Sequence, residues 1–273
     1  MVTTKSILAA LEFEQLEANR YRAGHAEFGH GVVSGGQLLA QTLVVATKGH
    51  EGKLPKTIHT IFARAASPEV PVDVLVTPVQ SGRTFASASV TISQRDRVCA
   101  QSLVLLTADE PDLIRHGDEA RTVTAPPGPV DDGSWQVHID GGIDLAEPDS
   151  VGPPDVDVWV CFAGAPSDPL LDQALLAFST DFFLIGTAMR PHAGVGQAQS
   201  HKTLSTGVIS HTLTFHEPAP AAGWTLLRNH STYAGRGRSY GRADVFRSDG
   251  SLAASFVQDA MIRPLGEAAG GRL

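Results

Sequence analysis

Residues 81–91 read SGRTFASASVT, and residues 236–246 read RGRSYGRADVF, about 155 positions later. Both stretches contain a Gly-Arg pair, a hydroxyl residue, an aromatic residue and then an alternation of small and polar residues. Such an alternation is typical of a half-buried strand. The repeat of this string indicates that the chain is an internal duplication.

The sequence around each copy supports a duplication. In the first half, residues 37–49 are apolar on nearly every face, which predicts a helix buried on all sides. Turn signals then separate four strand-like segments, at 57–65, 70–80, 84–94 and 97–108. A shorter apolar pattern over residues 5–18 predicts a lead-in helix.

The second half has the same order of elements after an opening strand at 156–164. Asp168 and Pro169 suit the N-cap and first turn of another strongly apolar helix. Four more strands follow, at 208–216, 224–234, 239–248 and 252–262.

These patterns predict three parts: an N-terminal half over 1–108, an acidic linker rich in Pro and Gly over 109–155, and a C-terminal half over 156–273. Within the halves, Ile58-His59-Thr60 matches Ser210-His211-Thr212 on the first strand after each helix. Each half therefore reads as one antiparallel sheet wrapped on one helix.

Composition limits the function. The chain has 273 residues, which exceeds one compact core, and a net charge of -8. An acidic chain is a poor partner for nucleic acid, whose phosphates need a basic surface. Cys99 and Cys161 each lie in an apolar run, as expected for buried free thiols in a reducing compartment. The first residues resemble neither a signal peptide nor a membrane span, so we expect a cytoplasmic protein without a membrane partner.

Five strings, in the right order, resemble motifs of the type II acyl-CoA thioesterases (TesB type), a family of double hotdog fold. The resemblance covers nearly the whole chain except the linker. It implies an α+β double hotdog, with two tandem antiparallel sheets each wrapped around a buried helix. The strings are GGQ-LAQ at 35–41, LAFSTDF at 176–182, RPHAG at 190–194, SHTLTFH at 210–216 and DGSLAAS-QDA at 249–260.

The resemblance also implies a mechanism in which water is the nucleophile. Carried over by position, Asp181 is the general base and Gln258 positions the water. The family's third residue, a Thr or Ser, falls on Val208, which has no hydrogen-bonding side chain. Ser210, two residues on and therefore on the same face of a regular strand, is the first candidate to replace it, and Thr206 is the second. The first half has no acid or Gln at the matching places, which predicts one active site per chain.

Other polar groups have weaker claims to a role. Gly35 and Gly36 precede the first buried helix, whose free N–H groups could receive a carbonyl oxygen or a phosphate. Arg83 and Arg238 could pair with the phosphates of coenzyme A. His59, His211 and His216 alternate with apolar residues, as structural histidines do. No metal-binding spacing or nucleotide-binding loop occurs, so we expect no metal and no cofactor.

The leading hypothesis is hydrolysis of acyl-CoA to a free fatty acid and coenzyme A, with the acyl chain in a tunnel between sheet and helix. A non-catalytic acyl-CoA-binding protein is the alternative, motivated by Val208. A hotdog enoyl-CoA hydratase is weaker, because that family carries a His five residues after its Asp, where this chain has Gly186. Exposed sheet edges and family habit predict a homo-oligomer, a dimer or larger.

Overall fold

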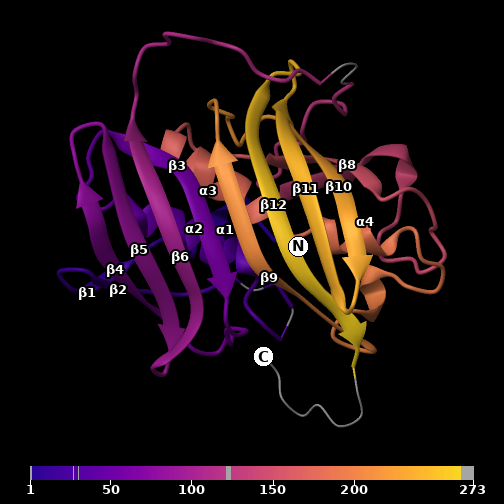
Figure 1. The fold of residues 1–273 in the computed structure, drawn as a ribbon. Coiled ribbons are helices and arrows are strands. Elements are labelled where there is room, and N and C mark those ends of the chain that lie inside the picture. The colour runs from indigo at the N-terminus through magenta and orange to yellow at the C-terminus, as the bar shows by residue number, and fades with distance from the viewer. Residues whose placement is uncertain (1, 27, 30, 121–123, 266–273) are drawn as a thin grey trace.

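The computed structural model describes residues 2–26, 28–29, 31–120 and 124–265. Twelve strands lie within these residues: β1 (Glu14–Glu17), β2 (Arg20–Ala23), β3 (Lys53–Phe62), β4 (Val72–Ser81), β5 (Phe85–Gln94), β6 (Arg97–Ala108), β7 (Trp135–Ile139), β8 (Asp155–Phe162), β9 (Leu204–Phe215), β10 (Thr225–Gly235), β11 (Arg238–Arg247) and β12 (Leu252–Pro264). They form one sheet in the order β1-β2-β4-β5-β6-β3-β9-β12-β11-β10-β8-β7. The two halves join in the middle, where β3 pairs antiparallel with β9 (Figure 1).

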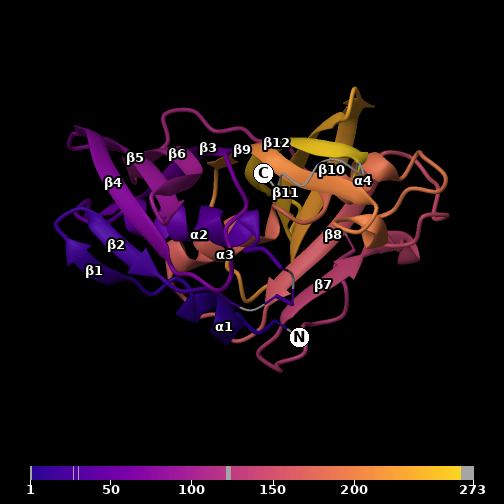
Figure 2. The same cartoon turned by 90° about the horizontal axis from the view of Figure 1, so that it is seen from below.

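Two helices lie side by side on the concave side of this sheet, α2 (Gly35–Ala46) and α3 (Pro169–Ser179) (Figure 2). The double hotdog of the α+β class is thereby confirmed, with the two expected sheets fused into a single one. Four short helical elements lie elsewhere: α1 (Thr4–Ala9), η1 (Asp140–Gly142), α4 (Leu184–Met189) and η2 (Gln197–Gln199).

The start of α3 is where the sequence predicts it. Asp168 Oδ1 accepts hydrogen bonds from the backbone N–H groups of Leu170 (2.9 Å) and Leu171 (3.0 Å), and Pro169 occupies the first turn. Residues Pro169–Met189 are also long and apolar enough to cross a membrane. Most of that stretch is buried inside the protein, as expected of a core helix.

The sequence patterns did not predict the outer strands of the two halves, β1 and β7. The predicted lead-in helix ends at Ala9, and residues Glu14–Glu17 form β1 instead. All four residues of β1 are exposed, so the strand has no apolar face to reveal it. The segment 109–155 likewise contains β7, which pairs with β8 along the opposite edge of the sheet. Pairing with a neighbouring strand, which local sequence does not encode, holds both edges in place.

The two matched histidine strings are not equivalent in position. His59 is exposed on the convex face, where its Nδ1 lies 2.7 Å from Thr212 Oγ1. His211 is fully buried on the concave face. The strings share a pattern of letters, but the register of β3 with β9 pairs His211 with Thr60 rather than with His59.

Candidate active site

Asp181 follows the last turn of α3 and faces the first turn of α2. A Cβ atom on Gly35 would lie 2.9 Å from Asp181 Oδ1, and one on Gly36 would lie 3.2 Å from Asp181 Cβ. The approach of the two helices is close, because a Cβ on Gly36 would also lie 2.2 Å from the carbonyl oxygen of Phe178. Glycine at position 36 is therefore required to bring the amino end of α2 onto the carboxylate.

The surroundings of Asp181 make its carboxylate a stronger base. Burial raises the pKa of Asp181 from 3.8 to about 6, although the nearby backbone N–H groups of Gly36 and Gly35 act to lower it. The buried Oδ1 has no hydrogen-bond partner among the described residues. A carboxylate in this state can accept a proton near neutral pH.

His211 connects the end of α3 to β12. Its Nε2 lies 3.0 Å from Thr180 Oγ1, and its Nδ1 lies 3.3 Å from Gln258 Nε2. The Thr180 hydroxyl donates its own hydrogen to the carbonyl oxygen of Ala177 (2.8 Å), so it must accept from His211 Nε2–H. Burial lowers the pKa of His211 to about 3, which keeps the ring neutral and leaves Nδ1 as an acceptor.

This network fixes the orientation of the Gln258 amide. Since His211 Nδ1 accepts, Gln258 must present its NH₂ group to the ring and turn Oε1 elsewhere. Gln258 is 2% exposed, and Oε1 has no hydrogen-bond partner among the described residues. Asp181 Oδ1 and Gln258 Oε1 are thus two buried acceptors without a partner among the described residues. The sequence marked His211 only as structural, because its partners lie far away along the chain.

Ser210 does not lie with these groups, which corrects the expectation from strand alternation. The β9–β12 ladder pairs Gln258 with His211 and Asp259 with Ser210, then skips Ile209 and pairs Ala260 with Val208. This bulge reverses the alternation of faces. Ser210 therefore lies on the convex face, where its hydroxyl donates to Asp259 Oδ2 (2.8 Å).

The other candidate hydroxyl, Thr206, is buried on the concave side but lies too far along the strand. It pairs with Ile262, four residues beyond Gln258 on β12. At about 3.4 Å per residue, that separation is about 14 Å, too long for one water to bridge. Val208 occupies the nearer position, opposite Ala260, and supplies no polar group.

The two candidate arginines lie at opposite ends of the sheet. Arg83 is in the turn before β5, where Ala108 N–H donates to the carbonyl oxygen of Thr84, at the end of the sheet away from Phe62. Phe62 marks the end that carries the site, because it lies next to Gly35. Arg238 begins β11 at that end, exposed and opposite Met261. The structure thus separates Arg83 from Asp181.

An aromatic cluster packs around Asp181. The Phe178 and Phe182 rings are 5.2 Å apart at their centroids and flank the acid in sequence, and Phe28 lies 5.3 Å from Phe178. Trp135 of β7 joins the cluster at 4.9 Å from Phe182. These rings exclude water from the carboxylate, which explains its raised pKa.

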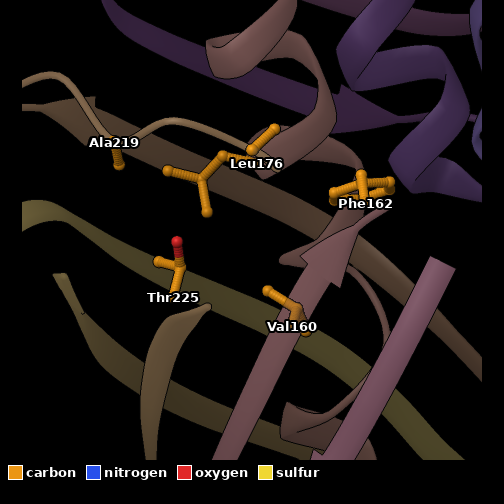
Figure 3. Close-up of a pocket in the computed structure, with 6 residues that line it drawn as sticks. Val160, Phe162, Leu176, Ala219 and Thr225 are labelled. Carbon is orange, nitrogen blue, oxygen red and sulfur yellow. The ribbon is translucent and has the colours of Figure 1, made fainter. Parts of the chain in front are cut away.

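A small cavity lies between α3 and the sheet, where the acyl tunnel was predicted. The cavity there has a volume of about 10 Å³, room for about one water (Figure 3). A larger pocket, of about 510 Å³, opens beside Phe28. Its lining residues are Gly24, His25, Phe28, Gly29, Pro68, Glu69 and Pro71.

No group of three or more His, Cys, Asp and Glu side chains within the described ranges could hold a metal ion. Both cysteines are buried and unpaired. Burial raises the pKa of Cys161 to about 11, which makes it a poor nucleophile.

Comparisons with known proteins agree with this geometry. Residues 24–107 match the family described as the acyl-CoA thioesterase N-terminal domain, and residues 112–262 match its C-terminal domain. Acyl-CoA thioesterase 2 of Haemophilus influenzae is 24% identical over 284 residues, covering 94% of this chain and 97% of the relative.

Two solved structures are also similar. An acyl-CoA thioesterase II, TesB2, from Mycobacterium marinum has a TM-score of 0.80 and 26% identity, covering 96% of this chain and 98% of that one. A tesB protein from Mycobacterium avium subsp. paratuberculosis has a TM-score of 0.82 and 23% identity, covering 96% of this chain and all of that one.

Fold and site together define a double hotdog protein with a partly buried carboxylate where its two central helices meet. The chain belongs to the type II acyl-CoA thioesterase family. Members of this family are thioester hydrolases, and so is this chain. The match to the N-terminal domain begins at residue 24, in the loop that leads into α2.

Proposed function

We propose that this protein hydrolyses acyl-CoA thioesters with a water that Asp181 and Gln258 hold and activate. Family membership supports the general reaction, the conversion of acyl-CoA to a free acid and coenzyme A. The assignment of roles to individual residues is our own and follows from their chemistry.

In the first step, the water donates one hydrogen to Asp181 and the other to Gln258 Oε1, which directs its lone pairs toward the thioester carbonyl. Asp181 takes the first proton as the water oxygen attacks the carbonyl carbon. The positive amino end of the α2 dipole would stabilise the negative charge that develops on the carbonyl oxygen. The carbon–sulfur bond then breaks, and the proton on Asp181 passes to the departing thiolate.

One observation carries this proposal: of the seven buried side-chain N and O atoms that lack partners among the described residues, two are the acceptors Asp181 Oδ1 and Gln258 Oε1. Leaving a buried polar atom unpaired costs about 1–3 kcal/mol, so such atoms are rare unless a water or substrate completes them. His211 contacts both Gln258 and Thr180, the residue before Asp181. One histidine therefore connects the segments that carry the two acceptors. A water is the simplest molecule that supplies two hydrogens.

The test is release of free thiol from acyl-CoAs of short to long chain length, with wild type and Asp181→Asn side by side. We expect turnover by wild type and a loss on the order of a hundredfold or more in the variant. Asp109→Asn is the control, because Asp109 is exposed at the far end of β6. Equal activity in wild type and Asp181→Asn would remove Asp181 from the mechanism.

Val208 motivates one alternative function, in which the protein binds acyl-CoA without hydrolysing it. The residue provides no hydroxyl where the family supplies a third polar group. Saturable binding of acyl-CoA, with no thiol released from any member of the panel, would favour this alternative over hydrolysis.

A further inference from the structure

Several arginines meet at the end of the sheet that carries the active site. Neighbouring strands are antiparallel, so β3, β5 and β12 end where β6, β9 and β11 begin (Figure 1). Basic residues dominate the turns at this end, although the chain as a whole has a net charge of -8. The charged side chains of the turns beside β3, β5, β6, β9, β11 and β12 are Arg64, Arg95, Arg97, Lys202, Arg236, Arg238 and Arg263, against Glu69 and Asp96; Glu14 and Asp73 lie at the same end, on β1 and β4.

Three of these residues, Arg64, Arg95 and Arg97, form one group that we call the β5–β6 arginine cluster. Arg95 and Arg97 belong to the tight turn between the two strands. Arg64 Nη1 donates to the carbonyl oxygen of Val98 (3.2 Å), and both Arg64 and Arg97 lie close enough to Cys99 to lower its thiol pKa against the effect of burial. None of the three makes an ion pair with a carboxylate in the described part of the chain, whereas Arg22 and Arg228 each do.

The walls of the large pocket contact residues next to Asp181 on one side and next to Arg95 on the other. On one side, Phe28 lines the pocket and packs against Phe178 and Phe182, with ring centroids 5.3 and 6.4 Å away. On the other side, the wall at 68–71 is tied to Gln94, the residue before Arg95. Gln94 Oε1 accepts from Ser67 N–H (2.8 Å), and Gln94 Nε2 donates to the carbonyl oxygen of Ser67 (2.8 Å) and to that of Val70.

The turn that holds the cluster has a strained backbone. Arg95 has φ of 49° and Asp96 has φ of 62°, both in the left-handed region. Asn and Gly are the usual residues of such two-residue turns, and other residues there cost about 1 kcal/mol each. Strain of this kind is retained where a side chain is needed for function. Arg236 in the β10–β11 turn has a similar φ of 55°, so what distinguishes the β5–β6 turn is its place beside Gln94 and the pocket wall.

We propose that Arg64, Arg95 and Arg97 bind the phosphate groups of the 3′-phospho-ADP half of coenzyme A, and that the pocket beside Phe28 holds the phosphopantetheine arm. The inference rests on the proposed function, because it takes acyl-CoA as the substrate. Guanidinium groups bind phosphates through paired, charge-assisted hydrogen bonds. The phosphopantetheine arm separates the phosphates from the thioester, as the pocket separates the cluster from Asp181.

The test compares kcat and KM for an acyl-CoA with those for the same acyl group on pantetheine, which lacks the nucleotide. In the triple variant Arg64→Gln/Arg95→Gln/Arg97→Gln, we expect KM for acyl-CoA to rise about ten- to thirtyfold with kcat little changed. Hydrolysis of acyl-pantetheine should change less than twofold. A matched triple variant, Arg236→Gln/Arg242→Gln/Arg263→Gln, should retain the wild-type KM for acyl-CoA.

Two kinetic outcomes overturn the proposal: an equal rise in KM for both substrates in the first variant, or loss of acyl-CoA affinity in the matched variant instead. A binding measurement keeps the test separate from catalysis. Calorimetry with 3′,5′-ADP should detect binding to wild type and at least tenfold weaker binding to the first triple variant. If wild type hydrolyses neither substrate but this difference remains, the phosphate site stands and the proposed hydrolysis fails. If 3′,5′-ADP binds both proteins equally, the phosphate site is wrong.

Discussion

Asp181→Asn should stabilise the folded protein at neutral pH while it removes hydrolysis. The pKa of Asp181 is raised from 3.8 to about 6 by burial, so the folded state resists ionisation of this group. A rise of about two pKa units corresponds to about 3 kcal/mol of stability lost on ionisation, at 1.36 kcal/mol per unit. An amide has a similar shape and no charge to bury, so the variant avoids this cost.

The sign of the effect sets the pH window. Below pH 3.8 the carboxyl is protonated in both folded and unfolded states, so wild type and variant should have similar stability. As pH rises through about 6, the unfolded state has already released its proton and the folded state must follow at a cost. The advantage of Asp181→Asn should therefore grow between about pH 4 and pH 6 and stay level above it.

Urea unfolding followed by tryptophan fluorescence, at intervals from pH 4.5 to pH 8.5, measures this difference. Above pH 7 the variant should gain about 3 kcal/mol, or on the order of 6–12 °C in melting temperature. Asp109→Asn, which replaces an exposed carboxylate, should show no comparable gain. A variant that is equally stable or less stable than wild type at pH 8 would falsify the claim that Asp181 is held in the fold against its own ionisation.

Three more outcomes follow from the geometry. The kcat/KM for acyl-CoA hydrolysis should rise with pH through an apparent pKa near 6, since Asp181 acts as its base; a flat profile between pH 5 and 7 would contradict that role. Ser210→Ala should leave hydrolysis within about twofold of wild type, because the hydroxyl faces Asp259 on the convex side, and a tenfold loss would show that it reaches the site after all. Gly36→Ala should lower the free energy of unfolding by about 3 kcal/mol, because its Cβ would collide with the Phe178 carbonyl. Gly207→Ala, where a Cβ would meet open space, should change the free energy of unfolding far less. Equal effects of the two substitutions in denaturant titrations would count against the tight helix contact.

Much of the fold was predictable because it depends on local chemistry repeated twice. An apolar helix that lacks a polar face has to be buried, and alternating strands separated by turn residues have to pair. Asp168 and Pro169 mark a helix start by direct backbone bonding. The outer strands β1 and β7 were not predictable in this way. Their residues form strands because they pair with a neighbouring strand, and their sequences show no alternation of buried apolar and exposed polar residues that would predict this.

The candidate site divides along the same line. Asp181 and Gln258 could be named from a family resemblance, and the amino end of the first buried helix could be recognised as a possible binding point. The third residue could not, because a single skipped residue at Ile209 turns Ser210 to the other face of the sheet. Strand alternation is local and regular, whereas a bulge is decided by how two distant strands pair.

The sequence by itself determined the duplication, the two central helices, the antiparallel strands of each half and the acid at the end of the second helix. The duplication, the helices and the strands rest on short-range patterns of apolar and turn residues, whereas the role of the acid rests on the family resemblance. Only the tertiary structure decided that Gly36 brings one helix onto the acid at the end of the other, and that His211 turns the Gln258 amide. Both depend on contacts between residues more than 40 positions apart, where packing and register, not local preference, set the geometry.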